Sequence, residues 1–242
     1  MKALVKKIAH ANKDYALFND DDRIAIGISG GKDSTLLALA LNAFKKAFNL
    51  KLEIVGIHLN MGFGEDDIEP LKQLFEAEGI PFIIVPTQIS DILKLHTKKG
   101  VIQCSLCSKL KKGAVIQAAI DAGYTKIAFA HHADDAIETL FLNAIYGAKL
   151  ATFEPKMHLT TQNVTFIRPF IYVKEKDIET MVRELQLPII KSGCPVDKHT
   201  KRQEIKNLLN EIYTTYPEAH DNFITMLHND ENVKLWKKML TR

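Results

Sequence analysis

The chain has 242 residues, of which 46% are hydrophobic and 25% are charged, and its net charge at pH 7 is +3. This length and apolar content suffice for a buried core, in one domain with extensions or in a large and a small domain. The mild positive charge permits an anionic partner but argues against a strongly basic protein that coats nucleic acid. No apolar run reaches the roughly 18 residues of a membrane span, so we expect no membrane partner.

The first 18 residues place lysines among apolar residues at helical spacing. A secretory signal would carry a continuous apolar block after its first charges, and this segment has none. We therefore expect an amphipathic helix here and a cytoplasmic protein. A cytoplasmic location also argues against structural disulfides.

Apolar strands and helical segments alternate over the first two thirds of the chain. We expect strands at residues 23–29, 51–58, 81–85 and 126–130. We expect the helices that follow them at residues 34–48, 67–79, 105–122 and 135–146. This order predicts an α/β fold, with a parallel sheet that carries helices on both faces. Ligands of such sheets bind at the carboxyl ends of the strands.

The pattern changes after residue 150. Residues 156–171 are expected to form a β-hairpin or an extended excursion. Helices are expected at residues 174–186, 199–215 and 219–240. We therefore divide the chain into a catalytic domain, residues 1–172, and a helical C-terminal region, residues 173–242, that carries Cys194.

The first expected strand leads into its helix through six residues: Ser29, Gly30, Gly31, Lys32, Asp33 and Ser34. The glycines allow the backbone to approach a ligand closely, and the N–H groups at the helix start favour an anion. The serine hydroxyls add donors, and Asp33 can cap the helix or help to hold Mg²⁺ beside phosphates. The spacing differs from that of a Walker loop, and a capped helix after a glycine turn is the alternative.

The three cysteines are Cys104, Cys107 and Cys194, and an odd number cannot be fully paired within one chain. The first two lie near the start of an expected helix beside lysines, which favours the thiolate form. A zinc site would need a histidine as its fourth ligand. A redox pair of Cys104 and Cys107, a [4Fe–4S] cluster with one open iron, and unrelated buried cysteines are the other readings. The spacing alone leaves all four open.

The string SGGKDS, directly after a buried strand, matches the signature of the PP-loop ATP pyrophosphatases. Those enzymes cleave ATP between the α- and β-phosphates and adenylate a substrate. Together with the downstream CSLCSKLKKG and a later lone cysteine, it resembles the TtcA/TtuA superfamily of tRNA 2-thiolation enzymes, and most of all the tRNA 2-thiocytidine synthetases. The segments HHADD, ETLFLNAIYG, IRPF and KEKDI are similar to that family as well, so the resemblance covers about residues 20–215.

The resemblance implies an oxygen-sensitive [4Fe–4S] cluster held by Cys104, Cys107 and Cys194. In the family, the open iron is thought to carry the sulfide that attacks the activated base. TtuA-type enzymes carry additional zinc-ribbon cysteines, which this chain lacks. The resemblance also implies ATP and Mg²⁺ on the loop of residues 29–34.

Further site residues come from the same resemblance. Asp134 and Lys111 are expected to act on the substrate base, while His131 or His132 lines the ATP site. His58, at the end of the second strand, is expected near the nucleotide, and Arg168 is similar to a family arginine near the active site. Simpler readings exist for these residue types: a helix N-cap for the aspartate, a solvated lysine, a core histidine and an exposed strand arginine.

The predicted function is ATP-dependent tRNA thiolation. The C2 oxygen of a pyrimidine, with cytidine favoured, attacks the α-phosphorus, and sulfide then displaces AMP. The sulfur donor would be sulfide or a persulfide-carrying protein, and family members are often homodimers. Basic clusters that could contact tRNA phosphates lie at residues 98–99, 109–112 and 198–202. An adenylating enzyme for a small metabolite, and a non-enzymatic redox or nucleotide-binding module, are the alternatives.

Overall fold

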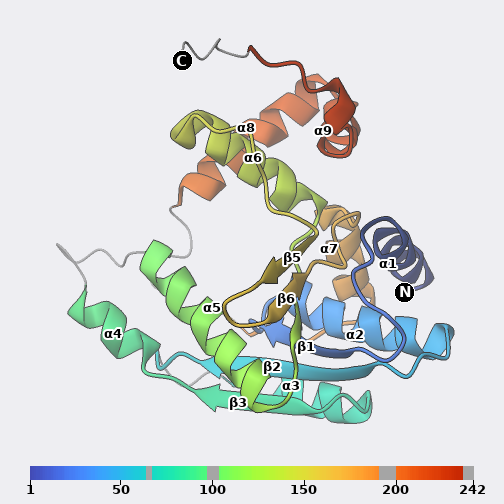
Figure 1. The fold of residues 1–242 in the computed structure, drawn as a ribbon, viewed down its shortest axis with the longest axis vertical. Helices are drawn as coiled ribbons and strands as arrows, with labels where there is room; N and C mark the ends of the chain where they lie inside the picture. The colour runs from blue at the N-terminus through green and yellow to red at the C-terminus, as the bar shows by residue number, and fades with distance from the viewer. Residues whose placement is uncertain (64–66, 97–103, 191–199, 237–242) are drawn as a thin grey trace. The chain divides into compact units, whose positions relative to one another are not determined.

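The structure is a computed structural model that describes residues 1–63, 67–96, 104–190 and 200–236 (Figure 1). The chain forms two compact units. The first comprises Met1–Ala136 and Phe153–His199, and the second comprises Ile137–Thr152 and Thr200–Arg242. The division at residue 172 stays a prediction about which parts function as domains.

The first unit contains a six-stranded sheet in the order β3-β2-β1-β4-β6-β5. The strands are β1 (Arg23–Ile28), β2 (Glu53–Asn60), β3 (Phe82–Pro86), β4 (Lys126–Ala128), β5 (Lys156–Leu159) and β6 (Val164–Ile167). All neighbours pair in parallel except β5, which runs antiparallel to β6 at the edge. The predicted α/β fold is therefore confirmed, with the antiparallel β5 as an addition to the parallel sheet. Of the two forms expected for residues 156–171, the hairpin is the one present.

The order of the strands reverses beside β1. The chain proceeds from β1 through β2 to β3 on one side, and then crosses to β4 on the other side of β1. A crevice opens at such a point because the connections leave the two strands in opposite directions. The segments that follow β1 and β4 are the phosphate loop and the HHADD segment.

The helices match the predicted segments with two differences. They are α1 (Lys2–Tyr15), α2 (Lys32–Ala47), α3 (Glu69–Ala77), α4 (Ile89–Leu95), α5 (Cys104–Asp121), α6 (Ala133–Gly147), α7 (Glu175–Glu184), α8 (Lys201–Thr215) and α9 (Ala219–Leu227). The seven-residue α4 was not predicted, because so short a segment shows little periodicity. The helix predicted to reach residue 240 ends at Leu227, where the hydrogen bonds tighten to the i−3 pattern and a 3₁₀ turn, Asp230–Asn232, follows.

Helices cover both faces of the sheet (Figure 1). On one face, Val115 and Ala119 of α5 pack with Val55, Ile127 and Phe166 of the strands in a buried apolar cluster. On the other face, α2 carries a nearly continuous buried run and contacts α1 and α7. In the second unit, α6, α8 and α9 pack around Ile137, Ile205 and Leu209. Among the described residues, no helix is long and apolar enough to cross a membrane.

Candidate active site

The phosphate loop has a backbone that requires glycine. Gly30 has φ +83°, and a Cβ there would lie 2.9 Å from the Cβ of Ile190. Ile190 also donates its backbone N–H to the Gly30 carbonyl at 2.9 Å. The segment after α7 therefore packs directly on the loop, four residues before Cys194, which itself lies outside the described residues.

Side-chain hydroxyl groups stabilise the loop through hydrogen bonds to its own backbone. Ser29 Oγ accepts the Gly31 N–H at 3.2 Å, and Ser34 Oγ accepts the Ser29 N–H at 3.1 Å. The hydroxyls of Ser34 and Thr35 both donate to the Gly31 carbonyl, at 3.2 and 3.1 Å. Gly31 occupies the N-cap position of α2 and brings no side chain that would compete with an anion there.

Lys32 and Asp33 form the charged side of the loop. Lys32 Nζ lies 3.1 Å from Asp33 Oδ1 and 3.0 Å from Glu175 Oε1 at the start of α7. Burial lowers the pKa of Lys32, but these two carboxylates outweigh burial and the net shift is upward. Asp33 Oδ1 is buried and, despite the near lysine, accepts no hydrogen bond of good geometry from any described residue. An available carboxylate oxygen beside a phosphate loop suits a magnesium ion.

The HHADD segment places a second pair of carboxylates around one histidine. The ring of His132 is buried, with Nδ1 3.6 Å from Asp134 Oδ2 and Nε2 3.4 Å from Asp135 Oδ2. Asp135 also accepts the backbone N–H of His132 at 3.1 Å, and Asp134 accepts the Glu175 N–H at 2.7 Å. The starts of α6 and α7 are thereby joined, and Glu175 links both aspartate-bearing segments.

The pKa of His132 is shifted by the charged groups of this site. Burial lowers its pKa, but Asp134, Asp135 and Asp33 together raise it above the ordinary histidine value. The contribution of Asp33 shows that the phosphate loop and the HHADD segment share one electrostatic environment. The three carboxylates therefore favour the protonated form of this imidazole.

The pH dependence of stability tests this arrangement. Because the pKa of His132 is higher in the folded than in the unfolded protein, the stabilisation is complete below the unfolded pKa of about 6.5 and is lost as pH rises through the folded value. We expect the melting temperature of the wild type, relative to that of His132→Gln, to fall as the pH rises above about 6.5 in magnesium-free buffer. A difference that grows with pH would show that the histidine is held neutral.

The other predicted residues lie in different surroundings. His58 is buried at the end of β2, with Nδ1 3.0 Å from the Ile28 carbonyl. The His131 ring lies 5.0 Å from that of Phe153, between centroids. Lys111 is exposed on α5. The roles assigned to these residues stay predictions.

The cysteines are only partly covered. Cys104 begins α5, but its side chain is outside the described part of the structure, as is all of Cys194. Cys107, one helical turn on, is half-buried against the apolar cluster under α5. No group of three histidine, cysteine or carboxylate side chains with metal-binding geometry occurs within the described ranges. Cysteine thiolate is a ligand type that soft metals and iron–sulfur clusters take.

Sequence reasoning missed several residues of the site. Glu175 was seen only as part of the KEKDI segment, and no sequence signal connected it with Lys32. Ile190 and Phe153 were not identified at all, because ordinary apolar residues carry no chemical signature. Arg168, which could have been exposed on a strand, is buried instead.

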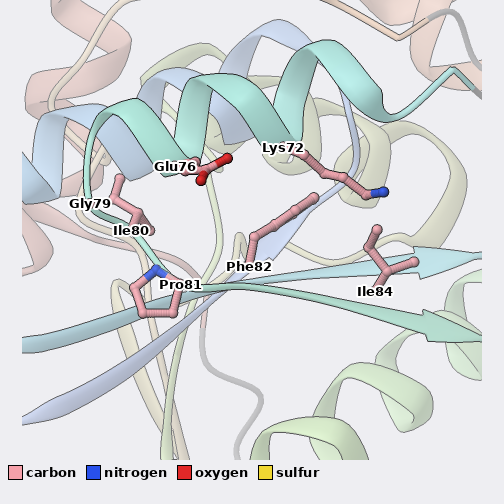
Figure 2. Close-up of a pocket in the computed structure, with 7 residues that line it drawn as sticks. All are labelled: Lys72, Glu76, Gly79, Ile80, Pro81, Phe82 and Ile84. Carbon is pink, nitrogen blue, oxygen red and sulfur yellow. The ribbon is translucent and has the colours of Figure 1, made fainter.

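A surface pocket lies away from this site (Figure 2). It has a volume of about 450 Å³ and lies between α3 and the edge strand β3. Its lining consists of Lys72, Glu76, Gly79, Ile80, Pro81, Phe82 and Ile84. Because β3 is separated from β1 by β2, we do not assign this pocket to the chemistry at the switch point.

Comparison with known proteins agrees with the geometry. Residues 1–212 match the model of the PP-loop domain family, and the chain belongs to that family. It is 36% identical to the tRNA-cytidine(32) 2-sulfurtransferase of Actinobacillus pleuropneumoniae, over 94% of this chain and 72% of that protein. It is 31% identical to the enzyme of the same name from Anaeromyxobacter, over 93% of this chain and 75% of that one. The predicted resemblance to tRNA 2-thiolation enzymes is confirmed.

A solved structure shows the same fold. The U34-tRNA thiolase NcsA of Methanococcus maripaludis, determined with its [4Fe–4S] cluster, superimposes with a TM-score of 0.77. The match covers all of this chain and 83% of NcsA, at 24% sequence identity. At this identity, the likeness establishes the fold.

Proposed function

We propose that this protein is an ATP-dependent tRNA sulfurtransferase that replaces the C2 oxygen of a cytidine with sulfur. The observation that carries the proposal is the meeting of two segments at the switch point of the sheet. Glu175 accepts a hydrogen bond from Lys32 of the phosphate loop and donates its backbone N–H to Asp134 after β4. Carboxylates of both segments raise the pKa of His132. The similarity of the sequence to tRNA-cytidine(32) 2-sulfurtransferases supports thiolation as the reaction.

ATP binds on the loop of residues 29–34. The start of α2 offers its positive dipole end to the phosphates, and Lys32, which lies 3.0 Å from Glu175, would bind a phosphate oxygen instead. Asp33 would hold Mg²⁺, which would offset the charge of the pyrophosphate that leaves. The C2 oxygen of the base attacks the α-phosphorus, which forms an O-adenylate and turns a poor leaving oxygen into a good one.

Sulfide then adds to C2 of the adenylated base as HS⁻, and AMP leaves from the same carbon. One proton is released in this exchange, and we assign its acceptance to Asp134. Its hydrogen bond from the Glu175 N–H holds the carboxylate in a fixed position. Lys111 would orient the base, as the family resemblance implies.

We further propose a [4Fe–4S] cluster bound by Cys104, Cys107 and Cys194. When bound, such a cluster supplies a site for sulfide next to the activated base. The hydrogen bond from the Ile190 N–H to the Gly30 carbonyl supports this assignment. It holds Ile190 at the phosphate loop, and Ile190 is only four residues before Cys194 in the sequence. Sulfide or a persulfide-carrying protein would provide the sulfur, and we expect a cytoplasmic homodimer.

The proposal is tested by anaerobic reaction of the purified protein with ATP, sulfide and tRNA that lacks thiolation. We expect release of AMP and pyrophosphate that depends on tRNA, with 2-thiocytidine in the nuclease digest. The control is the same tRNA transcript in which uridine replaces the cytidine that becomes thiolated. Pyrophosphate release without tRNA would favour an adenylating enzyme for a small metabolite, and no release with any tRNA would favour a binding module.

A further inference from the structure

A row of aromatic rings runs beside the Asp134 segment. Phe166 of β6 lies 5.1 Å from Phe129, Phe129 lies 5.9 Å from His131, and His131 lies 5.0 Å from Phe153, all between ring centroids. Phe129 directly follows β4, so the row lies at the carboxyl ends of β4 and β6. Through the adjacent His131 and His132, it adjoins the carboxylates of the candidate active site.

Two cations lie over the two ends of this row. Lys112 Nζ is 4.6 Å from the centroid of Phe166, and the guanidinium carbon of Arg168 is 4.7 Å from that of Phe153. Arg168 is only 7% exposed and donates to the Glu154 carbonyl. Its Nε is buried and has no hydrogen-bond partner among the described residues. The ring faces hold both cations in place by cation–π attraction.

Neither cation has a carboxylate partner within ion-pair distance in the described part of the chain. Lys112 is exposed, whereas three partly buried lysines of this unit each have such a partner: Lys7 pairs with Asp177, Lys32 with Glu175 and Lys126 with Asp22. Burial lowers the pKa of Arg168 to about 10, and burial and then Arg168 lower the pKa of Lys112. The two like charges repel each other, and an anion bound by both would relieve that repulsion.

We propose that Lys112 and Arg168 bind a backbone phosphate of the RNA substrate, beside the nucleotide whose base reaches Asp134. This inference rests on the proposed function and names a residue pair for substrate binding. The strand order supports an RNA phosphate over a phosphate of ATP. The ATP loop follows β1, Asp134 follows β4, and the two cations lie over Phe166 and Phe153 on the β6 side. The planar guanidinium suits bidentate contact with a phosphate.

The test measures dissociation constants of the full-length protein for unmodified tRNA and for a non-hydrolysable ATP analogue, across a range of potassium chloride. For Lys112→Gln we expect about tenfold weaker tRNA binding and a salt slope reduced by about one, because one phosphate contact is lost. The affinity for the ATP analogue should change by less than about twofold if the anion is not part of ATP.

Lys51→Gln is the matched control. It removes the same charge from an exposed position before β2, at the opposite end of the strands. A second variant, Arg168→Lys, keeps the charge but not the planar fork, and its melting curve reports whether the buried site still folds. We expect tRNA binding of this variant to weaken by about threefold to tenfold.

Three results would overturn the proposal. The first is equal tRNA binding and salt slope for Lys112→Gln and Lys51→Gln. The second is loss of ATP-analogue binding with unchanged tRNA binding, which would assign the anion to the nucleotide. In both cases a wild type that still thiolates tRNA leaves the proposed function intact. The third is a wild type that neither binds nor thiolates tRNA, in which case the proposed function fails as well.

Discussion

Asp134→Asn is expected to lower kcat for tRNA thiolation by about 10²- to 10⁴-fold, the usual range for loss of a proton-transferring group. Asparagine has nearly the same shape, and its oxygen can still accept the Glu175 N–H that now lies 2.7 Å from Asp134. The start of α7 therefore stays in place, and the variant loses only the negative charge and the proton acceptor. Single-turnover formation of 2-thiocytidine measures this effect directly.

Two further measurements separate chemistry from structure in this variant. The affinity for the ATP analogue should remain within about threefold, because Asp134 is not part of the phosphate loop. The matched control is Asp177→Asn, which makes the same change on α7 in a partly exposed ion pair with Lys7 and should leave the rate nearly unchanged. If Asp134→Asn keeps the wild-type rate, Asp134 serves only to join α6 and α7.

Cys107→Ser is expected to remove bound iron and to reduce thiolation to the background rate. The serine oxygen is a hard ligand that keeps its proton, whereas an iron–sulfur cluster requires thiolates. Because serine has almost the volume of cysteine, the half-buried position on α5 should tolerate it, so the fold and ATP binding survive. Iron and acid-labile sulfide per chain, measured after anaerobic purification, check the prediction, with about four of each expected in the wild type.

Ser105→Ala is the control on the same helix, at an exposed position two residues before Cys107. It should retain iron, sulfide and activity. Cys194→Ser should behave like Cys107→Ser if all three cysteines bind one cluster. Stoichiometric zinc in the wild type, or iron that remains in Cys107→Ser, would contradict the cluster and favour a persulfide route for the sulfur.

Much of the fold could be predicted because its signals are local. The apolar runs of β1, β2 and β3, the glycines after α3 and α5, and the amphipathic N-terminal helix each depend on residues within one or two turns. The SGGKDS string was informative for the same reason: a strand, a tight turn and a helix start follow one another directly. The short α4 and the early end of α9 were missed, since seven residues or a frayed end carry too little periodicity.

By itself, the sequence determined the strand–helix alternation, the phosphate loop and the chemical types available for a site. The tertiary structure alone decided which of these meet. Lys32 and Glu175 are 143 residues apart, yet they lie 3.0 Å from each other, and Arg168 is buried against Phe153 instead of exposed on a strand. Such pairings depend on the order of the strands, which long-range packing of apolar faces selects and which no short stretch of sequence encodes.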